Sequence, residues 1–293
     1  MKNSVYTIQT IKNSFRSGNN PSYIYSNVLP LFVPGSTLFK NYNDSLKSEF
    51  LSALQEAGVN EVDSVFRWNT ISEIINNGFQ NKLELSKIEE QLLAFYRPLL
   101  KPERTIINQT VRNERCYQMV QNYILGDSVL DYGCGKGLLG EKIKKDLKKN
   151  VVLVDTIDFN KSELPLSLID SNGITKLESK SIDTSIAYLV LHHMDNPYSG
   201  IKELSRLTKS RIILMEGYIE KDEYLYINQT IDWFFNRILL GVNMNVPLNF
   251  LKLKEWELLI EQVGFKISKI QYVGADEKLA PEHHVLIIAD SLR

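Results

Sequence analysis

An acid followed by three alternating glycines forms the clearest chemical pattern in this 293-residue chain. Asp131 is followed by Gly133, Gly135 and Gly137, with a short apolar run before the acid and a helical pattern after the last glycine. Glycine allows unusual backbone angles and lets a ligand lie against bare backbone, and the start of a helix offers free N–H groups. The pattern therefore predicts a strand, a ligand-binding turn and a helix.

The spacing of the glycines indicates which ligand this turn would bind. A dinucleotide-binding turn has the spacing G-x-G-x-x-G, whereas this turn has the spacing G-x-G-x-G. The carboxylate of Asp131 would repel a pyrophosphate, but it would favour a ligand that carries an amino group and a sulfonium. We therefore predict that the turn binds S-adenosylmethionine (SAM), with Asp131 and the three glycines as cofactor-binding residues.

A second acid ends the next apolar run. Residues 151–155 have the pattern of a buried parallel strand, and this strand closes with Asp155. A strand–helix–strand crossover places neighbouring strand ends side by side, so a carboxylate here can accept hydrogen bonds from both ribose hydroxyls. We predict this role for Asp155, with the nearby Asp158 as the alternative.

All 4 histidines of the chain fall at predicted strand ends. His192 and His193 follow the fourth predicted strand, and His283 and His284 begin the last one. Ligands of open α/β sheets bind outside the carboxyl ends of the strands. We therefore expect the two histidine pairs to lie about 10 Å apart across one cavity, with one strand between them.

Three roles are open for these histidines. They can pack or hydrogen-bond at the sheet edge. His192 or His193 can act as a general base toward the methyl acceptor, because imidazole titrates near neutral pH. The pairs can also bind a metal together with Glu216 or Asp232, but their spacing matches no dedicated metal motif. We predict that His192 and His193 are catalytic and that no metal is bound.

The remaining pattern predicts an α/β fold behind an all-helical N-terminal region. Helices are expected at residues 44–57, 62–76, 85–95 and 111–123, with Asp44 capping the first and Gly78 ending the second. The last two strands should form an antiparallel pair. The predicted strands lie at residues 129–131, 151–155, 166–169, 185–191, 211–215, 265–273 and 284–289.

Two regions are expected along the chain. Residues 1–110 form a helical cap, either a purely structural one or a lid that shapes the substrate pocket. Residues 111–293 form the SAM-binding domain, in which residues 218–250 are a helical insert that covers the active site. Arg115 lies on the helix before the first strand, where it either meets the carboxylate of SAM or faces solvent.

Several segments resemble the class I SAM-dependent methyltransferases, and in particular the type 11-like small-molecule enzymes. The resemblance spans roughly residues 111–293 and implies a sheet of order 3-2-1-4-5-7-6 whose last strand is antiparallel. One segment departs from the family, because Lys176 and Ser179 stand where proline and aspartate are usual. Apart from the acid–glycine turn, the segments that carry the resemblance are 190–193, 216–217, 232–237, 247–249 and 256–265.

The resemblance also implies further site residues. Cys134, within the turn, and Leu191, after the fourth strand, would contact SAM. Asp170, close to Gly173, would lie on the adenine side of the pocket. The substrate side would be lined by Glu216, Trp233, His283 and His284.

The composition limits the partners and the location. A net charge of -1 and a pI ≈ 6.5 provide no broad basic field, so we predict no nucleic-acid partner. No apolar run approaches the roughly 20 residues of a bilayer span, so we predict no membrane partner. Of the 2 cysteines, Cys134 lies where a disulfide would obstruct the pocket, which predicts reduced thiols and a cytoplasmic protein. The oligomeric state stays open between monomer and homodimer.

These features together predict methyl transfer from SAM to an oxygen or nitrogen atom of a small molecule by in-line displacement. Two alternatives remain at this point. The chain can be a protein or peptide methyltransferase that uses its helical cap as a docking surface. It can also be a regulatory module that binds SAM without catalysis, although the intact glycines and Asp155 favour an enzyme.

Overall fold

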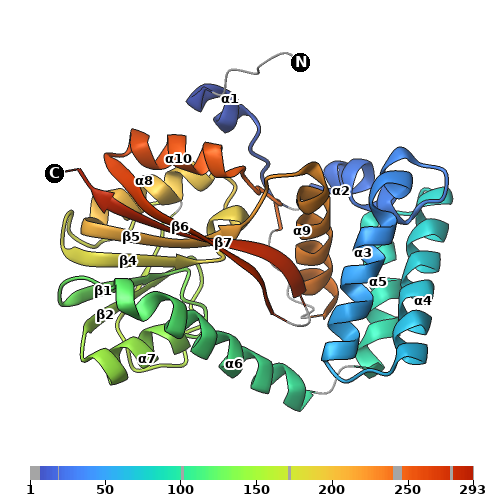
Figure 1. Ribbon diagram of the computed structural model, residues 1–293, viewed down its shortest axis with the longest axis horizontal. Coiled ribbons are helices and arrows are strands. Elements are labelled where there is room, and N and C mark those ends of the chain that lie inside the picture. The colour runs from blue at the N-terminus through green and yellow to red at the C-terminus, as the bar shows by residue number, and fades with distance from the viewer. Residues whose placement is uncertain are drawn as a thin grey trace.

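The computed structural model consists of a sheet covered by helices and a helical cap at one end of that sheet (Figure 1). It describes residues 7–18, 20–99, 102–170, 173–239, 246–277 and 280–292. Residues 1–6 of the predicted cap and residues 240–245 of the predicted helical insert therefore lie outside the described residues. Within the described ranges, none of the helices combines the length and apolarity that a bilayer span needs.

The sheet has seven strands in the order β3-β2-β1-β4-β5-β7-β6, which confirms the predicted order. The first five strands are mutually parallel, and β7 runs antiparallel to both β5 and β6. The carboxyl ends of β1, β2, β4 and β5 therefore meet at one edge, which faces the cap in Figure 1. The strands are β1 Ser128–Tyr132, β2 Asn150–Asp155, β3 Leu166–Leu168, β4 Ile182–Tyr188, β5 Thr208–Gly217, β6 Phe265–Glu277 and β7 Ala280–Ser291.

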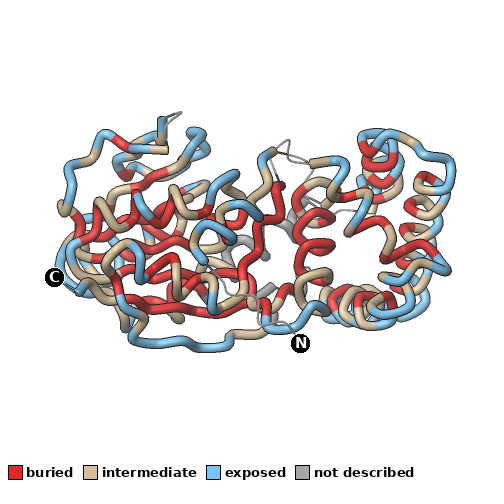
Figure 2. The backbone as a smooth tube through the Cα atoms, turned by 90° about the horizontal axis from the view of Figure 1, so that it is seen from above, coloured by how far each residue is buried: buried red, intermediate tan, exposed pale blue. Residues whose placement is uncertain are grey.

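Alternating residues of the strands bury the two faces of the sheet. Val129 of β1 packs in one cluster with residues of α6 (Pro102–Val120) and α7 (Leu138–Leu147). Its neighbour Leu130 packs in a second cluster with α8 (Pro197–Leu207), α10 (Leu253–Gln262) and Ile11 of α1 (Ile8–Asn13). Successive side chains of a strand point to opposite faces, so both layers of helices are held by the same strands. Figure 2 shows the buried backbone running through the sheet and continuing into the cap.

The cap has a core of its own, which it shares with one helix of the sheet region. Trp68 of α4 and Ile88 of α5 pack in the same cluster as Ile231 and Trp233 of α9 (Asp222–Phe234). In Figure 1, α9 stands between the sheet and the cap. The helices of the cap are α2 Pro21–Asn27, η1 Leu29–Phe32, α3 Thr37–Glu56, α4 Glu61–Gln80, α5 Leu85–Tyr96 and η2 Arg97–Leu99.

Two predicted helix ends in the cap are wrong. α3 begins at Thr37, where Ser36 Oγ accepts a hydrogen bond from the N–H of Phe39, so Asp44 lies inside the helix. α4 continues past Gly78 to Gln80. A Cβ atom on Gly78 would lie 2.5 Å from Cγ1 of Ile88, so this glycine permits the close approach of α4 and α5 instead of ending a helix.

Three further boundaries differ from the predicted ones. α6 runs from Pro102 to Val120, whereas the predicted helix spans residues 111–123. The fourth strand ends at Tyr188, because Leu189 adopts a positive φ of 54° and the following apolar residues enter the short turn η4, Leu191–His193. α9 is followed by η5, a π-helical segment over Phe235–Leu239, in place of a uniform helix.

Candidate active site

The glycine turn after β1 leaves one side of the backbone open. Gly133 and Gly137 have positive φ values of 74° and 77°. The N–H groups of Gly133 and Cys134 donate to the carbonyl oxygen of Val154 at 2.7 and 3.1 Å, which ties the turn to β2. A Cβ on Gly133 would lie 2.2 Å from Val190, whereas a Cβ on Gly135 would meet no atom within 4 Å. Gly135 therefore marks the face on which a ligand can lie against the backbone.

Asp155 lies beside this open face. Its Oδ2 accepts a hydrogen bond from the N–H of Gly135 at 2.8 Å, and its Oδ1 accepts one from the N–H of Thr156 at 2.7 Å. The parallel register pairs Tyr132 with Val154, so the ends of β1 and β2 are neighbours, as expected. Asp158 is exposed and accepts a hydrogen bond from the N–H of Asn160. The predicted role of Asp155 toward the ribose is compatible with this geometry and stays a prediction.

Asp131 is oriented differently from the expectation. Its carboxylate is 3% exposed and accepts a hydrogen bond from the N–H of Gly140 in α7 at 3.1 Å. Burial raises the pKa of Asp131 to about 7, the charge of Asp155 adds to this shift, and the Gly140 hydrogen bond opposes it. The carboxylate therefore stabilises the start of α7, and its predicted role toward SAM stays a prediction.

The thiol of Cys134 remains protonated in this site. Burial raises its pKa well above the ordinary range, and the charges of Asp131 and Asp155 raise it further. Its Sγ lies 4.0 Å from Oδ2 of Asp155. Both Cys134 and Cys116 are free cysteines. A raised pKa disfavours the thiolate form, which is the reactive form of a cysteine.

The three other predicted cofactor residues lie in different settings. Asp170 is exposed, and its Oδ1 accepts a hydrogen bond from the N–H of Ile174 at 3.0 Å, which closes the turn that contains Gly173. Arg115 is exposed on α6, and Leu191 is buried behind the fourth strand. Nothing in these contacts tests their predicted roles toward SAM.

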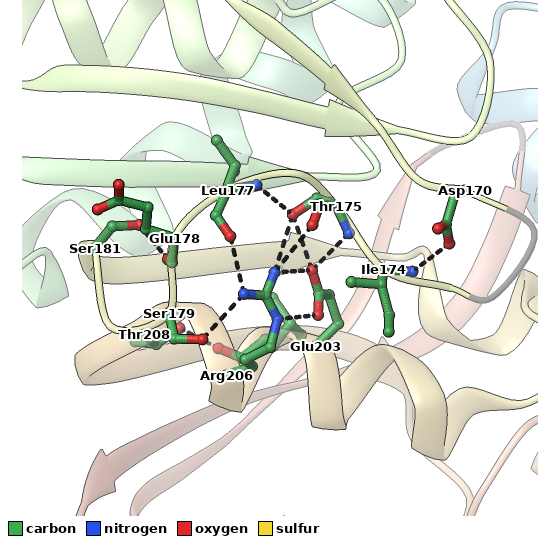
Figure 3. Close-up of polar contacts among 11 residues, drawn as sticks. Asp170, Ile174, Thr175, Leu177, Glu178, Ser179, Ser181, Glu203, Arg206 and Thr208 are labelled. Carbon is green, nitrogen blue, oxygen red and sulfur yellow. Dashed lines mark hydrogen bonds and ion pairs between the residues drawn. The ribbon is translucent and has the colours of Figure 1, made fainter.

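The segment that departs from the family pattern is held by α8 (Figure 3). Glu203 Oε1 accepts hydrogen bonds from the N–H and the hydroxyl of Thr175, both at 2.9 Å. The guanidinium of Arg206 lies between Glu203, with which it forms a bidentate ion pair, and the carbonyl oxygen of Leu177, to which it donates at 2.9 Å. An ion pair between buried Glu203 and half-buried Arg206 therefore orders the loop before β4 without the usual proline.

Glu216 organises the turn that carries the histidine pair. It is fully buried at the end of β5. One carboxylate oxygen, Oε1, accepts a hydrogen bond from the N–H of Leu191 at 2.9 Å. The other, Oε2, lies 2.7 Å from Nδ1 of His192. Glu216 thus fixes both the backbone of η4 and the orientation of the His192 ring.

Asp232 approaches both histidines from α9. Its Oδ1 lies 3.8 Å from Nε2 of His192 and 3.6 Å from Nε2 of His193, and it accepts a hydrogen bond from the side chain of Asn236 at 2.7 Å. Among the described residues, Asp232 Oδ2 and His193 Nδ1 are buried and have no hydrogen-bond partner. The π-helical segment begins three residues after Asp232, and such segments are frequent at functional sites.

The two neighbouring imidazoles differ in their electrostatics. Burial alone would lower the pKa of His192, but Glu216 and Asp232 overcome it and raise the pKa to about 10. Burial lowers the pKa of His193 to about 4, and Asp232 opposes this only in part. For Asp232, burial would raise the pKa, but His193 and His192 bring it below its ordinary value. The surroundings thus shift the pKa values of these two adjacent histidines in opposite directions.

Three further charged or titratable residues surround this cluster. Glu282 and His284 of β7 are buried, with 3.1 Å between Glu282 Oε2 and His284 Nε2. Burial raises the pKa of Glu282, and the charge of Asp232 raises it further. Arg112 of α6 lowers the pKa of both Asp232 and His193. Sequence reasoning missed Arg112 and Glu282, although Arg112 is one helical turn from Arg115 and Glu282 shares a strand face with His284.

Two predicted substrate residues point away from the histidine pair. His283 Nδ1 lies 2.5 Å from the hydroxyl of Tyr272, and its Nε2 lies 3.5 Å from Glu49 on α3. Trp233 is fully buried, and its Nε1–H donates to Glu89 of α5 at 2.9 Å. Adjacent strand residues face opposite sides, so only His284 of the second pair lies on the side of Glu282 and Asp232.

Residues 130–215 match the family model described as "Methyltransferase domain". This span contains the glycine turn, Asp155 and the His192–His193 pair, and it runs from β1 to the end region of β5. The cap, α9 and β7 lie outside it. No curated protein matches the chain significantly.

Solved structures with a similar arrangement come from several organisms. A SAM-dependent methyltransferase from Methanosarcina mazei aligns at 16% identity over 60% of this chain and 98% of its own, with a TM-score of 0.47. A protein from Pyrococcus horikoshii OT3 aligns at 17% identity over 68% and 98%, also with a TM-score of 0.47. Magnesium protoporphyrin IX methyltransferase from Synechocystis PCC 6803 with bound SAH aligns at 18% identity over 64% and 84%, with a TM-score of 0.43. None of these likenesses indicates an acceptor.

Proposed function

We infer that this chain, whose residues 130–215 form a methyltransferase domain, transfers the methyl group of SAM to an oxygen or nitrogen atom of a small molecule. The cofactor is SAM. The observation that carries the cofactor site is the contact between Gly135 and Asp155, which places an open backbone face beside a carboxylate. Such a pair suits a nucleoside whose ribose hydroxyls donate to the carboxylate while its chain crosses the glycines.

The acceptor is proposed to bind beyond the ends of β4 and β5, against the His192–His193 pair. This edge is where ligands of open α/β sheets bind, and α9 and the cap cover it. Methyl transfer is an in-line displacement, so holding the acceptor atom, the methyl carbon and the sulfur in line provides much of the rate. An edge covered by α9 and the cap favours a small acceptor, and the two free cysteines agree with a cytoplasmic location.

His193 is the better placed of the two histidines to take the acceptor's proton. Both ring nitrogens of His192 face carboxylates, those of Glu216 and Asp232. His193 has a ring nitrogen, Nδ1, without a partner among the described residues, and its side chain is 17% exposed, against 1% for His192. These contacts support His193 as the proposed base and His192 as a residue that positions it.

The acceptor class can be tested with methyl-labelled SAM and a cell extract. After incubation, the label is separated into small-molecule and protein fractions, and Asp155→Ala serves as the cofactor-site variant, with Asp158→Ala as its matched control. We expect label in the small-molecule fraction with the wild type and with Asp158→Ala. With Asp155→Ala we expect loss of transfer, since charge-assisted hydrogen bonds contribute about 1.5–3 kcal/mol each. Label in protein would contradict the proposal.

A further inference from the structure

We propose that His192, His193 and Asp232 bind a divalent transition-metal ion at the acceptor side of the site. One atom from each side chain can be chosen so that all three lie within 4.8 Å of one another. The separations of 3.8 and 3.6 Å from Asp232 Oδ1 to the two Nε2 atoms exceed those of hydrogen bonds. Around a tetrahedral ion with bonds of about 2.0–2.1 Å, ligand atoms lie about 3.4 Å apart. The three side chains thus leave room for an ion between them, and Asp232 does not form a hydrogen bond with either imidazole.

The surroundings orient these side chains as ligands. Glu216 Oε2 lies 2.7 Å from His192 Nδ1, and an N–H at Nδ1 leaves Nε2 as a lone-pair donor toward Asp232. Metal-bound histidines almost always donate their other ring N–H to a carboxylate, a carbonyl or water. Asn236 orients Asp232 by donating to Oδ1 at 2.7 Å. His192 and Asp232 are therefore already oriented by hydrogen-bonding partners of the kind that surround metal ligands.

Two further observations point to a missing cation. Asp232 is 3% exposed, yet its Oδ2 has no hydrogen-bond partner among the described residues, and an unpartnered buried carboxylate oxygen is costly. Glu216 and Glu282 bring two more buried carboxylates, while Arg112 brings one guanidinium close to Asp232. These buried carboxylates make the cluster a favourable place for a cation.

The donor set selects the kind of ion. Two imidazoles and one carboxylate suit Zn²⁺, Fe²⁺, Co²⁺ or Ni²⁺, whereas Mg²⁺ and Ca²⁺ prefer all-oxygen sites. Three protein ligands leave a position open, as in catalytic zinc sites. The partly exposed ring of His193 gives access to that position. If the proposed function holds, the open position fits an acceptor that binds through an oxygen atom, and His193 then acts as a ligand and not as a base.

Metal uptake by the full chain tests this proposal without an activity assay. The chelator-treated protein is titrated with Zn²⁺ and Co²⁺, followed by calorimetry and by the visible d–d absorption of bound Co²⁺. The variants are Asp232→Asn, His193→Ala and Glu216→Gln, with His283→Ala as the control that removes a histidine on the other side of β7. SAM affinity is measured on the same samples, so a failure of the cofactor assignment is seen separately.

We expect one ion per chain in the wild type and in His283→Ala. Glu216→Gln should weaken metal affinity by roughly 10–100-fold, as loss of an outer partner does, and the two ligand variants should lose more. Wild-type protein that takes up neither ion overturns the proposal, whether or not the variants fold. So does equal metal affinity in folded Asp232→Asn and His283→Ala. Activity that survives complete metal removal would leave His193 as the base and would overturn the catalytic use of the ion.

Discussion

Gly135 combines a backbone conformation that favours glycine with open space on the side where a ligand can bind. It has a positive φ of 52°, and a Cβ there would meet no atom within 4 Å. Gly58 in the cap has a φ of 84° and an equally open surrounding, so it provides a matched control. Leucine at either position should cost about 1–3 kcal/mol of backbone strain.

Only Gly135→Leu should also weaken SAM binding, by at least about tenfold, because its side chain would occupy the face on which the cofactor lies. Calorimetry with SAM, accompanied by thermal unfolding of both variants, measures the two effects separately. Equal SAM affinity in Gly135→Leu and Gly58→Leu would show that the turn is not the cofactor site.

Asp131 should make stability depend on pH in an unusual direction. Its pKa is raised to about 7 in the folded protein, against 3.8 as the ordinary value. A raised carboxyl pKa contributes stability below about pH 4, and this contribution is lost as the pH rises through about 7. Asp131→Asn keeps an oxygen that can accept from Gly140 but cannot ionise.

The free energy of unfolding of Asp131→Asn, relative to the wild type, should therefore increase by about 2 kcal/mol between pH 5 and pH 7. Urea unfolding at several pH values, without SAM, measures this difference. A difference that is constant with pH would mean that the carboxyl titrates normally. Asp127→Asn, at an exposed position near the start of β1, is the control.

At the level of single residues, the positions of side chains at strand ends could be predicted from the sequence. Contacts that come from elements distant in the sequence could not. The approach of Asp155 to the turn follows from β1 and β2 being neighbours, which the pattern of apolar runs already implied. The difference between His192 and His193 depends on Glu216 from β5 and Asp232 from α9, so no local pattern could reveal it. Likewise, the hydrogen bond from Gly140 to Asp131 depends on how α7 leaves the turn.

Glu89 of α5 links the cap to α9 and to the π-helical segment after it through polar contacts. Glu89 of α5 accepts from Trp233 Nε1 at 2.9 Å and forms an ion pair with Arg237 at 2.7 Å. Its side chain is 8% exposed, so breaking the pair should cost about 3 kcal/mol of stability. Glu90, the next residue, pairs with Lys87 in solvent, so loss of its charge should leave the stability almost unchanged.

Urea unfolding of Glu89→Gln and Glu90→Gln compares these two neighbours directly. SAM affinity should be unchanged in both, because Glu89 contacts Trp233 and Arg237 and Glu90 contacts Lys87, and none of these partners belongs to the glycine turn. Equal losses of stability would mean that the link between cap and α9 is carried by apolar packing alone. A loss of SAM affinity in Glu89→Gln would contradict the separation of cofactor site and cap.

Element types were predicted well, whereas element ends were not. α5 begins and ends within a residue of the prediction, because its apolar spacing and its flanks agree. Gly78 misled the prediction, since the glycine serves the packing of α4 against Ile88 and not the end of the helix. The predicted fourth strand is too long because Leu191 is apolar. An apolar residue can be buried in a strand or, as here, in a turn, and the sequence does not distinguish these two cases.

At the scale of the whole molecule, the sheet order could be predicted because the strand–helix alternation allows few arrangements. The way in which the cap attaches could not, because it depends on α9 contributing to the cap core with Trp233 while its neighbour Asp232 faces the histidines. The apolar pattern predicted an aromatic helix here. It did not indicate that one side of α9 packs in the cap core while another faces the histidine pair.

Asp232 and Trp233 are consecutive residues on a rigid helix, and one of them anchors in the cap while the other completes the histidine cluster. Displacing the cap by a fraction of an ångström therefore shifts a carboxylate at the reactive edge, with no change in any residue that touches the acceptor. Substitutions in the outer helices can thus change the histidine cluster of the proposed acceptor site without altering the glycine turn.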